Sequence, residues 1–449
     1  MLKSFPKGGI HPPDNKISAG AATSVLPLPA TVTVPLSQHI GAPAVAEVVK
    51  GDNVLVGQLI AKPGGFVSAA IHSPVSGTVL AVEPVAGASG VKGMAVTIRV
   101  DGDEWETSID RSTTLVTDCG QMDPSAIIAK IAAAGIVGMG GATFPTQVKL
   151  SPPPGKKADT LIINGVECEP YLTSDHRVML ERTAETLVGV GLLARALGVS
   201  NIYIGVENNK PDAIEALRRT VGDLVRFLPP IEIVPLKVQY PQGGEKQLVK
   251  AVTGREVPSG ALPIEVGCVV QNVGTALAIY EAVHKNKPLI ERVVTVTGKG
   301  IARPSNFLVR MGTPVSALIE AAGGLPQDAG KVIGGGPMMG RAMSNIDAPV
   351  TKGTSGIVVM SGREAARRTE TDCIKCGGCV TVCPMGLEPY LLARLAQKQR
   401  WDESEAGGVT DCIECGSCSY TCPARVPLLD WIRLGKAEVG RIIRARLNC

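Results

Sequence analysis

Residues 373–384 read C-I-K-C-G-G-C-V-T-V-C-P, and residues 412–423 repeat the pattern as C-I-E-C-G-S-C-S-Y-T-C-P. Both follow the spacing C-x2-C-x2-C-x3-C-P, which is typical of bacterial ferredoxins with two [4Fe–4S] clusters. In that arrangement the first three thiolates of a run bind one cluster, and the fourth, before the proline, binds the other. The predicted ligands are Cys373, Cys376, Cys379 and Cys422 for the first cluster, and Cys412, Cys415, Cys418 and Cys383 for the second.

A pair of structural zinc sites is the alternative use of these cysteines. Zinc modules usually take two cysteines from each of two separated knuckles, whereas here three cysteines come from one place and the fourth precedes a proline. The spacing therefore favours clusters, with about eight iron and eight sulfide ions per chain. Lone cysteines are usually small buried hydrophobes, so no ligand role is predicted for Cys119, Cys168, Cys268 or Cys449.

The composition is that of an ordinary globular protein. Of the 449 residues, 45% are hydrophobic and 19% are charged, which suits several domains that each bury a core. Aromatic residues make up 3% and the net charge is +4, which argues against binding nucleic acid. We find no signal-peptide pattern and no apolar run long enough to span a membrane. Clustered cysteines are typical of a reducing compartment, and we expect a cytosolic protein.

Hydrophobic periodicity divides the chain into successive parts. Residues 1–105 contain short β segments with tight turns, and they resemble a lipoyl- or biotinyl-carrier sandwich without its lysine-bearing tip. Residues 106–290 alternate buried strands with helices, which predicts a mostly parallel sheet. Residues 291–345 carry the strand–helix–strand pattern of a small β-grasp domain. We interpret residues 346–362 as a linker and residues 363–449 as a helical cluster domain.

A glycine-rich loop lies near the start of the α/β part, in the sequence G-I-V-G-M-G-G-A-T-F-P-T-Q-V-K that begins at residue 135. It follows a helical pattern rather than a strand, so it does not satisfy the general dinucleotide fingerprint. Gly138, Gly140 and Gly141 would still let backbone N–H groups approach a phosphate, and Lys149 would add positive charge. A plain loop is the alternative.

An acidic loop follows the first predicted strand of the α/β part. Residues 164–171 read N-G-V-E-C-E-P-Y and come directly after an apolar segment. Ligands of parallel sheets bind outside the carboxyl ends of the strands. Glu167 and Glu169 are therefore candidate binding groups, and a solvated acidic turn is the alternative.

These loops occur together in a known family. The sequence G-x-x-G-x-G-G-A-x-F-P-T, then N-x-x-E-x-E-P, then Gly243-Gly244-Glu245, and then Asn272 with Thr275 resemble the FMN- and NADH-binding subunit of respiratory complex I. With a sandwich in front and a two-cluster tail behind, the whole chain resembles RnfC, a peripheral subunit of the ion-translocating Rnf electron-transport complex. The resemblance implies a multidomain α/β protein with a barrel-sandwich N-domain, an α/β flavin-binding domain, an SLBB-like β-grasp domain and a helical two-[4Fe–4S] ferredoxin domain.

The resemblance also implies which residues bind cofactors. The glycine loop and Lys149 would hold the FMN phosphate and ribityl groups, two asparagines would bind the flavin, and Phe144 would stack on a ring. The two glutamates would face the nicotinamide nucleotide, and no side chain is expected to act as a catalytic acid, base or nucleophile. The predicted set is Gly138, Gly140, Gly141, Phe144, Lys149, Asn164, Glu167, Glu169, Gly243, Gly244, Glu245, Asn272 and Thr275.

The function that the resemblance implies is electron transfer. NADH would deliver hydride to FMN, and single electrons would pass through the two clusters and partner subunits to ferredoxin. The resemblance places the protein peripherally at the cytoplasmic face of the inner membrane, with membrane and iron–sulfur subunits as partners. A cluster-bearing adaptor without flavin is one alternative. A cobalamin reductase is another, but its family places the flavin module before the sandwich.

Basic residues alternate with apolar ones near the C-terminus. A basic amphipathic helix can dock on a membrane surface or an acidic partner, and a solvated helix face is the alternative. The basic residues are Arg433, Lys436, Arg441, Arg444 and Arg446, and the apolar ones are Ile432, Leu434, Ile442 and Ile443.

Overall fold

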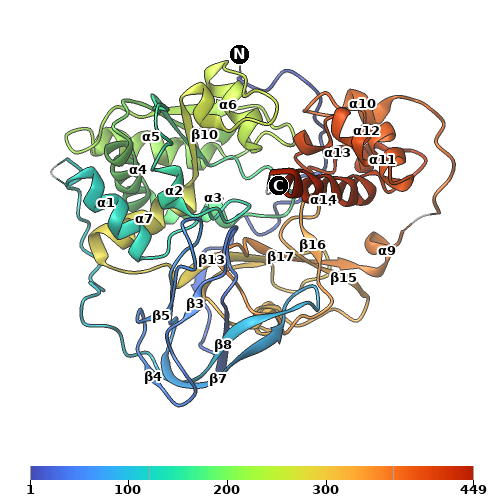
Figure 1. Cartoon of the computed structure of the whole chain (residues 1–449). Helices are drawn as coiled ribbons and strands as arrows, with labels where there is room; N and C mark the ends of the chain where they lie inside the picture. Colours follow the sequence, from blue (N-terminus) through green and yellow to red (C-terminus); the bar gives the residue numbers. More distant parts are fainter. Residues whose placement is uncertain (1, 121, 368, 448–449) are drawn as a thin grey trace.

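The computed structural model describes residues 2–120, 122–367 and 369–447, which form four parts packed against one another (Figure 1). In that view the N-terminal sandwich lies at the bottom, the α/β domain at the upper left and the helical cluster domain at the right, with the β-grasp sheet between them. None of the helices in these ranges combines the length and apolar character needed to cross a membrane. Cys449 lies outside the described residues.

The N-terminal domain is a sandwich of two small antiparallel sheets, which confirms the predicted β-rich fold. Side chains that alternate along its strands meet in a core that includes Val32, Ile60, Val79 and Ile98. One sheet has the order β2 (Thr31–Pro35), β8 (Lys92–Gly102), β7 (Ser76–Ala86) and β4 (Asn53–Val54). The other has the order β3 (Val45–Ala46), β5 (Leu59–Lys62) and β6 (Ile71–His72).

The α/β domain is built on a four-stranded sheet whose strands are all parallel, as the alternating pattern predicts. The order is β11 (Glu232–Leu236), β10 (Asn201–Glu207), β9 (Thr160–Asn164) and β12 (Cys268–Asn272). The chain runs outward from β9 through β10 to β11, and then returns to the other side of β9 as β12. The carboxyl ends of β9 and β12 therefore flank a topological switch point, which is where such sheets bind ligands.

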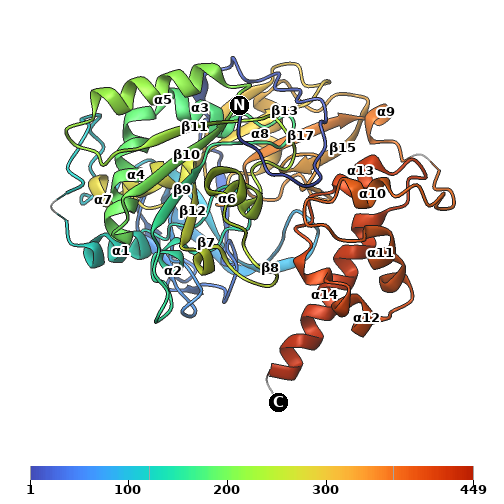
Figure 2. The ribbon, with the colours of Figure 1, turned by 90° about the horizontal axis from the view of Figure 1, so that it is seen from above.

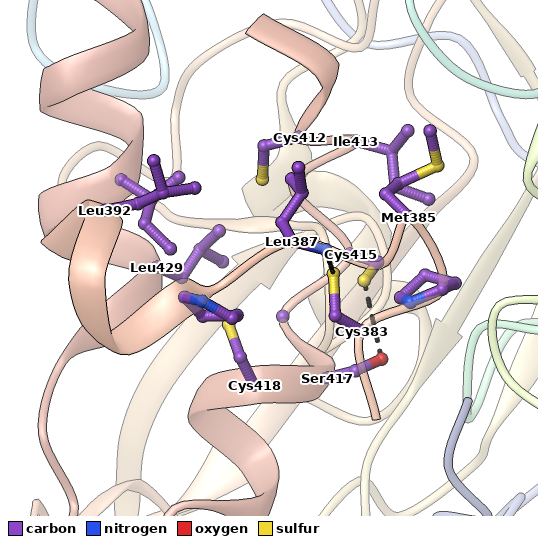
Figure 3. Close-up of a pocket in the computed structure, with 14 residues that line it drawn as sticks. Cys383, Met385, Leu387, Leu392, Cys412, Ile413, Cys415, Ser417, Cys418 and Leu429 are labelled. Atoms are coloured by element: carbon purple, nitrogen blue, oxygen red, sulfur yellow. Dashed lines mark hydrogen bonds between the residues drawn. The ribbon is translucent and has the colours of Figure 1, made fainter. Parts of the chain in front are cut away.

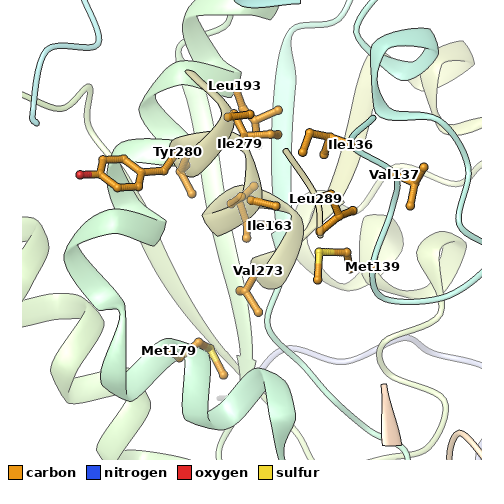
Figure 4. Close-up of a cluster of buried hydrophobic side chains, with 14 of the residues drawn as sticks. Ile136, Val137, Met139, Ile163, Met179, Leu193, Val273, Ile279, Tyr280 and Leu289 are labelled. Carbon is orange, nitrogen blue, oxygen red and sulfur yellow. The ribbon is translucent and has the colours of Figure 1, made fainter. Parts of the chain in front are cut away.

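Helices cover both faces of this sheet (Figure 2). The helices on one face share the largest core of the protein, and α6 packs on the other face against Ile162 and Val234. Figure 4 shows Ile136 and Met139, from the glycine loop, in the same core as Val273 and Ile279. The helices are α1 (Pro124–Ala133), α2 (Thr146–Lys149), α3 (Ser174–Glu181), α4 (Thr183–Leu197), α5 (Pro211–Asp223), α6 (Glu245–Thr253), the 3-10 turn Pro263–Val266 and α7 (Val273–Lys285).

The β-grasp domain contains more of the chain than its sequence pattern predicts. Residues 346–362, which the pattern identifies as a linker, contain β17 (Gly356–Ser361), and this strand lies between β13 and β15 inside the sheet. The segment ahead of the sandwich supplies β1 (Thr23–Val25), which pairs with β14. The other elements are β13 (Glu291–Thr297), β14 (Ser305–Arg310), α8 (Val315–Ala321), β15 (Ala329–Gly334) and β16 (Arg341–Ala342).

The helical domain packs its helices around Leu392, Val409, Leu428 and Ile432. Short helices follow the cysteine loops, and the long C-terminal helix lies across α11 and α12 (Figure 2). The elements are α10 (Gly378–Thr381), α11 (Pro389–Gln397), α12 (Trp401–Ala406), the 3-10 turn Val409–Asp411, α13 (Ser417–Thr421) and α14 (Leu428–Leu447). The short helix α9 (Gly362–Ala365) precedes this domain and packs against β15 and β17 of the β-grasp sheet.

Three of the five basic residues of α14 are used within the domain, while Arg441 pairs with Glu438 of the same helix, so docking through the remaining basic residues stays a prediction. Arg433 pairs with Glu414 at 3.0 Å, and Lys436 donates to the carbonyl of Cys412 at 2.6 Å. Arg446 pairs with Glu405 at 2.8 Å. These charges therefore hold α14 against the second cysteine loop and α12.

Lys352 joins three of the four domains. Its buried ammonium group donates to the carbonyls of Ala70 in the sandwich and Gly135 in the α/β domain, each at 2.7 Å. Its own carbonyl accepts from Arg292 of β13. Because both acceptors of the ammonium group are neutral carbonyls, removal from water lowers the pKa of Lys352 to about 7.

The free energy of unfolding is expected to rise with pH between about 7 and 10.5, the ordinary pKa of lysine. In this window the unfolded chain holds a proton on Lys352 and the folded chain does not, whereas below pH 7 both states are protonated. The slope from one group is at most about 1.4 kcal/mol per pH unit. Urea unfolding of Lys352→Met should give a flatter pH curve, and the exposed Lys157→Met is the control. Equal slopes in Lys352→Met and the unaltered chain would contradict this account.

Candidate functional site

Asn164 and Asn272 end β9 and β12 at the same register position of the sheet. The Asn272 side-chain oxygen accepts from the Gly274 N–H at 2.8 Å and so caps α7, while its amide donates to Asp175 Oδ2 at 2.7 Å. The glycine loop crosses directly over this amide, since a Cβ placed on Gly140 would lie 2.7 Å from Asn272 Nδ2. Only glycine fits that close approach. Sequence reasoning misses Asp175, because its contact with the site is a hydrogen bond from Asn272, a residue almost one hundred positions away at the end of β12.

The glycine loop is anchored on both sides and exposed at its tip. The Met139 N–H donates to Thr275 Oγ1 at 2.9 Å, and the Gly138 N–H closes the loop on the Phe144 carbonyl at 2.9 Å. Gly141 is exposed, and no atom lies within 4 Å of the place that its Cβ would take. This open tip lies beside the N-terminus of α7, where backbone N–H groups favour an anion. The donor set therefore fits the phosphate end of FMN.

The Lys149 side chain extends to β12 and forms an ion pair with Glu245. Its ammonium group lies 2.7 Å from Glu245 Oε1 and 3.2 Å from the Val270 carbonyl. The Asn164 amide donates to the Gly243 carbonyl at 2.9 Å, and Gly244 precedes α6. The structure thus brings the predicted residues of four separate loops together at the carboxyl edge. Phe144 is half-buried and contributes its carbonyl to the loop.

Glu167 serves as the N-terminal cap of α3. Its carboxylate accepts from the N–H groups of Asp175 at 2.8 Å and His176 at 3.1 Å. Its own carbonyl accepts from the ammonium group of Lys16 at 2.8 Å. The N–H groups at the start of α3 hold this carboxylate, and its predicted role toward the nicotinamide nucleotide stays a prediction.

Glu169 is directed toward the β-grasp domain, and its predicted contact with the nicotinamide nucleotide stays a prediction. Its carboxylate accepts from the Met338 N–H at 3.1 Å and the Met339 N–H at 2.7 Å, and Tyr240 Oη lies 3.5 Å away. Burial raises the pKa of this carboxyl group, and the two N–H groups oppose the shift. Glu169 therefore binds the acidic loop to the neighbouring domain.

Four cysteines from the two runs surround one cavity in the helical domain (Figure 3). The cavity encloses about 380 Å³ free of protein atoms, part of it open to solvent, and apolar side chains such as Leu387, Leu392 and Leu429 complete its wall. The cysteines are the set predicted to bind the second cluster, namely Cys383, Cys412, Cys415 and Cys418.

Burial keeps two thiols of this cavity protonated when no metal is bound. Burial raises the pKa of Cys412 to about 11 and that of Cys418 to about 12. A bound metal is what deprotonates such groups. The Leu387 N–H lies 3.4 Å from Cys383 Sγ, and the Glu414 N–H lies 3.4 Å from Cys412 Sγ. Hydrogen bonds of this kind tune the potential of a cluster.

The first cysteine set lies nearer to solvent. Cys376 is exposed, while Cys373, Cys379 and Cys422 are half-buried. A Cβ placed on Gly378 would lie 3.4 Å from Thr421, so the first loop packs beside the residue that precedes Cys422. The structure thus places the fourth predicted ligand next to the first run.

A site for a single metal ion does not occur among the described cysteine, histidine and acidic side chains. Ligands of one zinc ion converge on a point about 2.3 Å from each sulfur. The thiolates around a cubane each bind a different iron and stay further apart. The cavity gathers thiols from both cysteine runs, as a cluster shared between the runs requires, and this donor set fits [4Fe–4S].

Tyr240 connects the α/β domain to the second cysteine set, and the sequence pattern gives no sign of this role. Its hydroxyl group donates to the Cys415 carbonyl at 2.8 Å, beside Glu169. Ile10 pairs with Tyr240 through the backbone and shares an apolar cluster with Cys415 and Cys168. Cys119 and Cys268 are buried in the cores of the α/β domain.

Four family models match the chain in order. They are the RnfC barrel sandwich hybrid domain over residues 4–103, the Nuo51 FMN-binding domain over 131–281, an SLBB domain over 293–342 and a 4Fe–4S dicluster domain over 365–423. These matches confirm FMN and [4Fe–4S] clusters as the cofactors and confirm the predicted types of domain.

Relatives of known function match nearly the whole chain. Over 438 residues it is 47% identical to a subunit of the Na⁺-translocating ferredoxin:NAD⁺ oxidoreductase complex of Acetobacterium woodii, covering 96% of each chain. It is 46% identical over 407 residues to a subunit of the proton-translocating ferredoxin:NAD⁺ oxidoreductase complex of Clostridium ljungdahlii, covering 90% of this chain and 87% of that protein. A chain of an NAD⁺-reducing [NiFe]-hydrogenase shares the fold over 73% of this chain and 65% of its own, with a TM-score of 0.54 and 18% identity.

Proposed function

The chain belongs to the RnfC family of subunits of ion-translocating oxidoreductase complexes, and from this we propose that it exchanges electrons between NAD(H) and the iron–sulfur partners of such a complex. FMN, when bound, would accept hydride from NADH and release electrons singly. The protein's own part is to hold the cofactors close together.

One observation carries this proposal, namely the hydrogen bond from Tyr240 to the Cys415 carbonyl. The loop between Asn164 and Glu169 begins at the flavin edge and ends beside Tyr240. Five extended residues reach at most roughly 18 Å. This connection supports the proposal, because electron transfer requires a short distance between the proposed flavin edge and the second cysteine set.

The test is to purify the full chain without oxygen, reconstitute it with FMN, iron and sulfide, and follow NADH oxidation with a one-electron acceptor. Turnover that depends on both FMN and the clusters supports the proposal. A chain that holds both clusters but binds no FMN would be the adaptor instead. A chain that reduces cobalamin but not the other acceptors would instead be a cobalamin reductase.

The partner that receives electrons is proposed to bind over the first cysteine set. Cys376 is exposed there, and Ile374 and Tyr420 are 68% and 53% exposed. Exposed apolar side chains around a redox group favour docking of another protein. We place this partner among the iron–sulfur subunits of the complex, and the protein peripherally at the cytoplasmic face of the membrane, where thiols stay reduced.

Replacing both Ile374 and Tyr420 by serine is expected to slow electron exchange with the assembled complex about tenfold. A buried apolar anchor at an interface is worth on the order of 1–2 kcal/mol. NADH oxidation with a small soluble acceptor should stay unchanged, since that acceptor needs no docking surface. Phe66→Ser, at a 77% exposed residue of the sandwich, is the matched control. A slowdown in that control equal to that of the double variant would contradict the placement.

A further inference from the structure

Asp175 lies in the first turn of α3, at the edge where the flavin residues meet. It accepts a hydrogen bond of 2.7 Å from Asn272, the residue that the glycine loop crosses. A Cβ placed on Gly274, at the start of α7, would lie 3.8 Å from Asp175 Oδ1. This carboxyl group is therefore separated from the glycine loop by a single side chain.

Charged groups from three other segments face Asp175. Glu167 lies beside it and caps the same helix, and Arg292 approaches from β13. Lys16 donates to the carbonyls of Glu167 and Glu169 within the acidic loop. The Arg292 guanidinium is buried and donates to the Met139 carbonyl in the glycine loop at 3.3 Å. His176, the next residue, is paired with Asp212 at 2.9 Å and points its ring away to that partner.

Asp175 is poised to change its protonation near neutral pH. Burial is the largest influence and the Glu167 charge the next, and together they raise the pKa of Asp175 to about 7, while the Asn272 amide and Arg292 oppose the shift. Burial in turn lowers the pKa of Arg292 to about 10, so its guanidinium stays charged at neutral pH. A further negative charge at the flavin edge would therefore favour the protonated form of Asp175.

We propose that Asp175 is the proton-accepting residue of the flavin site, which binds one proton from solvent when the site gains negative charge and releases it when that charge leaves. The proposal rests on the proposed function, because the charge comes from NADH. Hydride transfer brings two electrons and one proton, so the site becomes more negative by one charge. One solvent proton on the Asp175 carboxylate balances that charge, and it returns to solvent as the electrons leave.

The test measures the midpoint potential of FMN bound to the full chain between pH 5.5 and 9. Reduction raises the affinity of Asp175 for a proton, so above about pH 7 the reduced protein should bind one more proton per two electrons than it does below. The curve of potential against pH should therefore steepen near pH 7. Asp175→Asn keeps an oxygen that can accept from Asn272 but cannot take up the proton, and its curve should lack this bend.

Asp212→Asn, the same substitution in the neighbouring helix, should keep the bend. Asp175→Glu should keep it at a shifted pH, which retains a test if the asparagine variant loses FMN. A wild-type curve without a bend, or a bend that survives unchanged in Asp175→Asn, would overturn the proposal. Failure of the unaltered chain to bind FMN, followed by flavin fluorescence, would instead count against the proposed function.

Discussion

Cys383→Ala is expected to remove the cluster held by Cys412, Cys415 and Cys418 and to leave the cluster of its own run in place. Iron should fall from about eight to about four per chain, because one of two cubanes is lost. The reason is the shared cavity, in which Cys383 faces the three cysteines of the other run. Anaerobic iron analysis and electron paramagnetic resonance of the reduced protein would measure the loss and identify which cluster remains.

Cys379→Ala is the matched control for this experiment, since it lies four residues earlier in the same run. It should remove the other cluster, so the two variants should give complementary resonance spectra. A combined Cys383→Ala and Cys412→Ala variant should lose no more iron than Cys383→Ala alone. If Cys383→Ala and Cys379→Ala instead remove the same cluster, the ligand sets are wrong.

Gly141→Val is expected to weaken FMN binding strongly while the protein keeps its thermal stability. The new side chain meets no protein atom within 4 Å of its Cβ, so it costs the fold little. It would occupy the open tip of the loop, where the phosphate end of FMN is proposed to lie. The loss of affinity should be at least tenfold, or about 1.4 kcal/mol, and the quenching of flavin fluorescence on titration would measure it.

Gly222→Val is the control, because a Cβ at Gly222 also meets no atom within 4 Å and the residue lies near the end of α5. It should leave FMN affinity unchanged. Gly140→Val tests the other half of the loop, since its Cβ would collide with Asn272, and it should lower both affinity and stability. Full FMN affinity in Gly141→Val would place the flavin phosphate elsewhere.

Local sequence patterns predicted those features of the protein that depend on residues close together in the chain. The spacing of Cys373, Cys376 and Cys379 is set by how one loop wraps a cluster, so it can be recognised without a fold. Strands that alternate with helices predicted the parallel sheet. The strand before Asn164 predicted a polar loop at the carboxyl edge of the sheet, and the structure brings Asn272 to the same register position.

Local patterns were therefore sufficient for the classes of domain and the cluster motifs, and they led to a proposed binding edge of the sheet. The contacts of the polar side chains at that edge depend on the packing of distant segments. Glu167 caps α3, Glu169 binds the loop before β16, and Asp175 holds Asn272. A carboxylate takes whichever N–H group the fold brings within reach, and these partners lie up to 170 residues away in the chain. Local patterns also did not predict β17 as a strand. Its pairing partners are β13 and β15, which are not its neighbours in sequence.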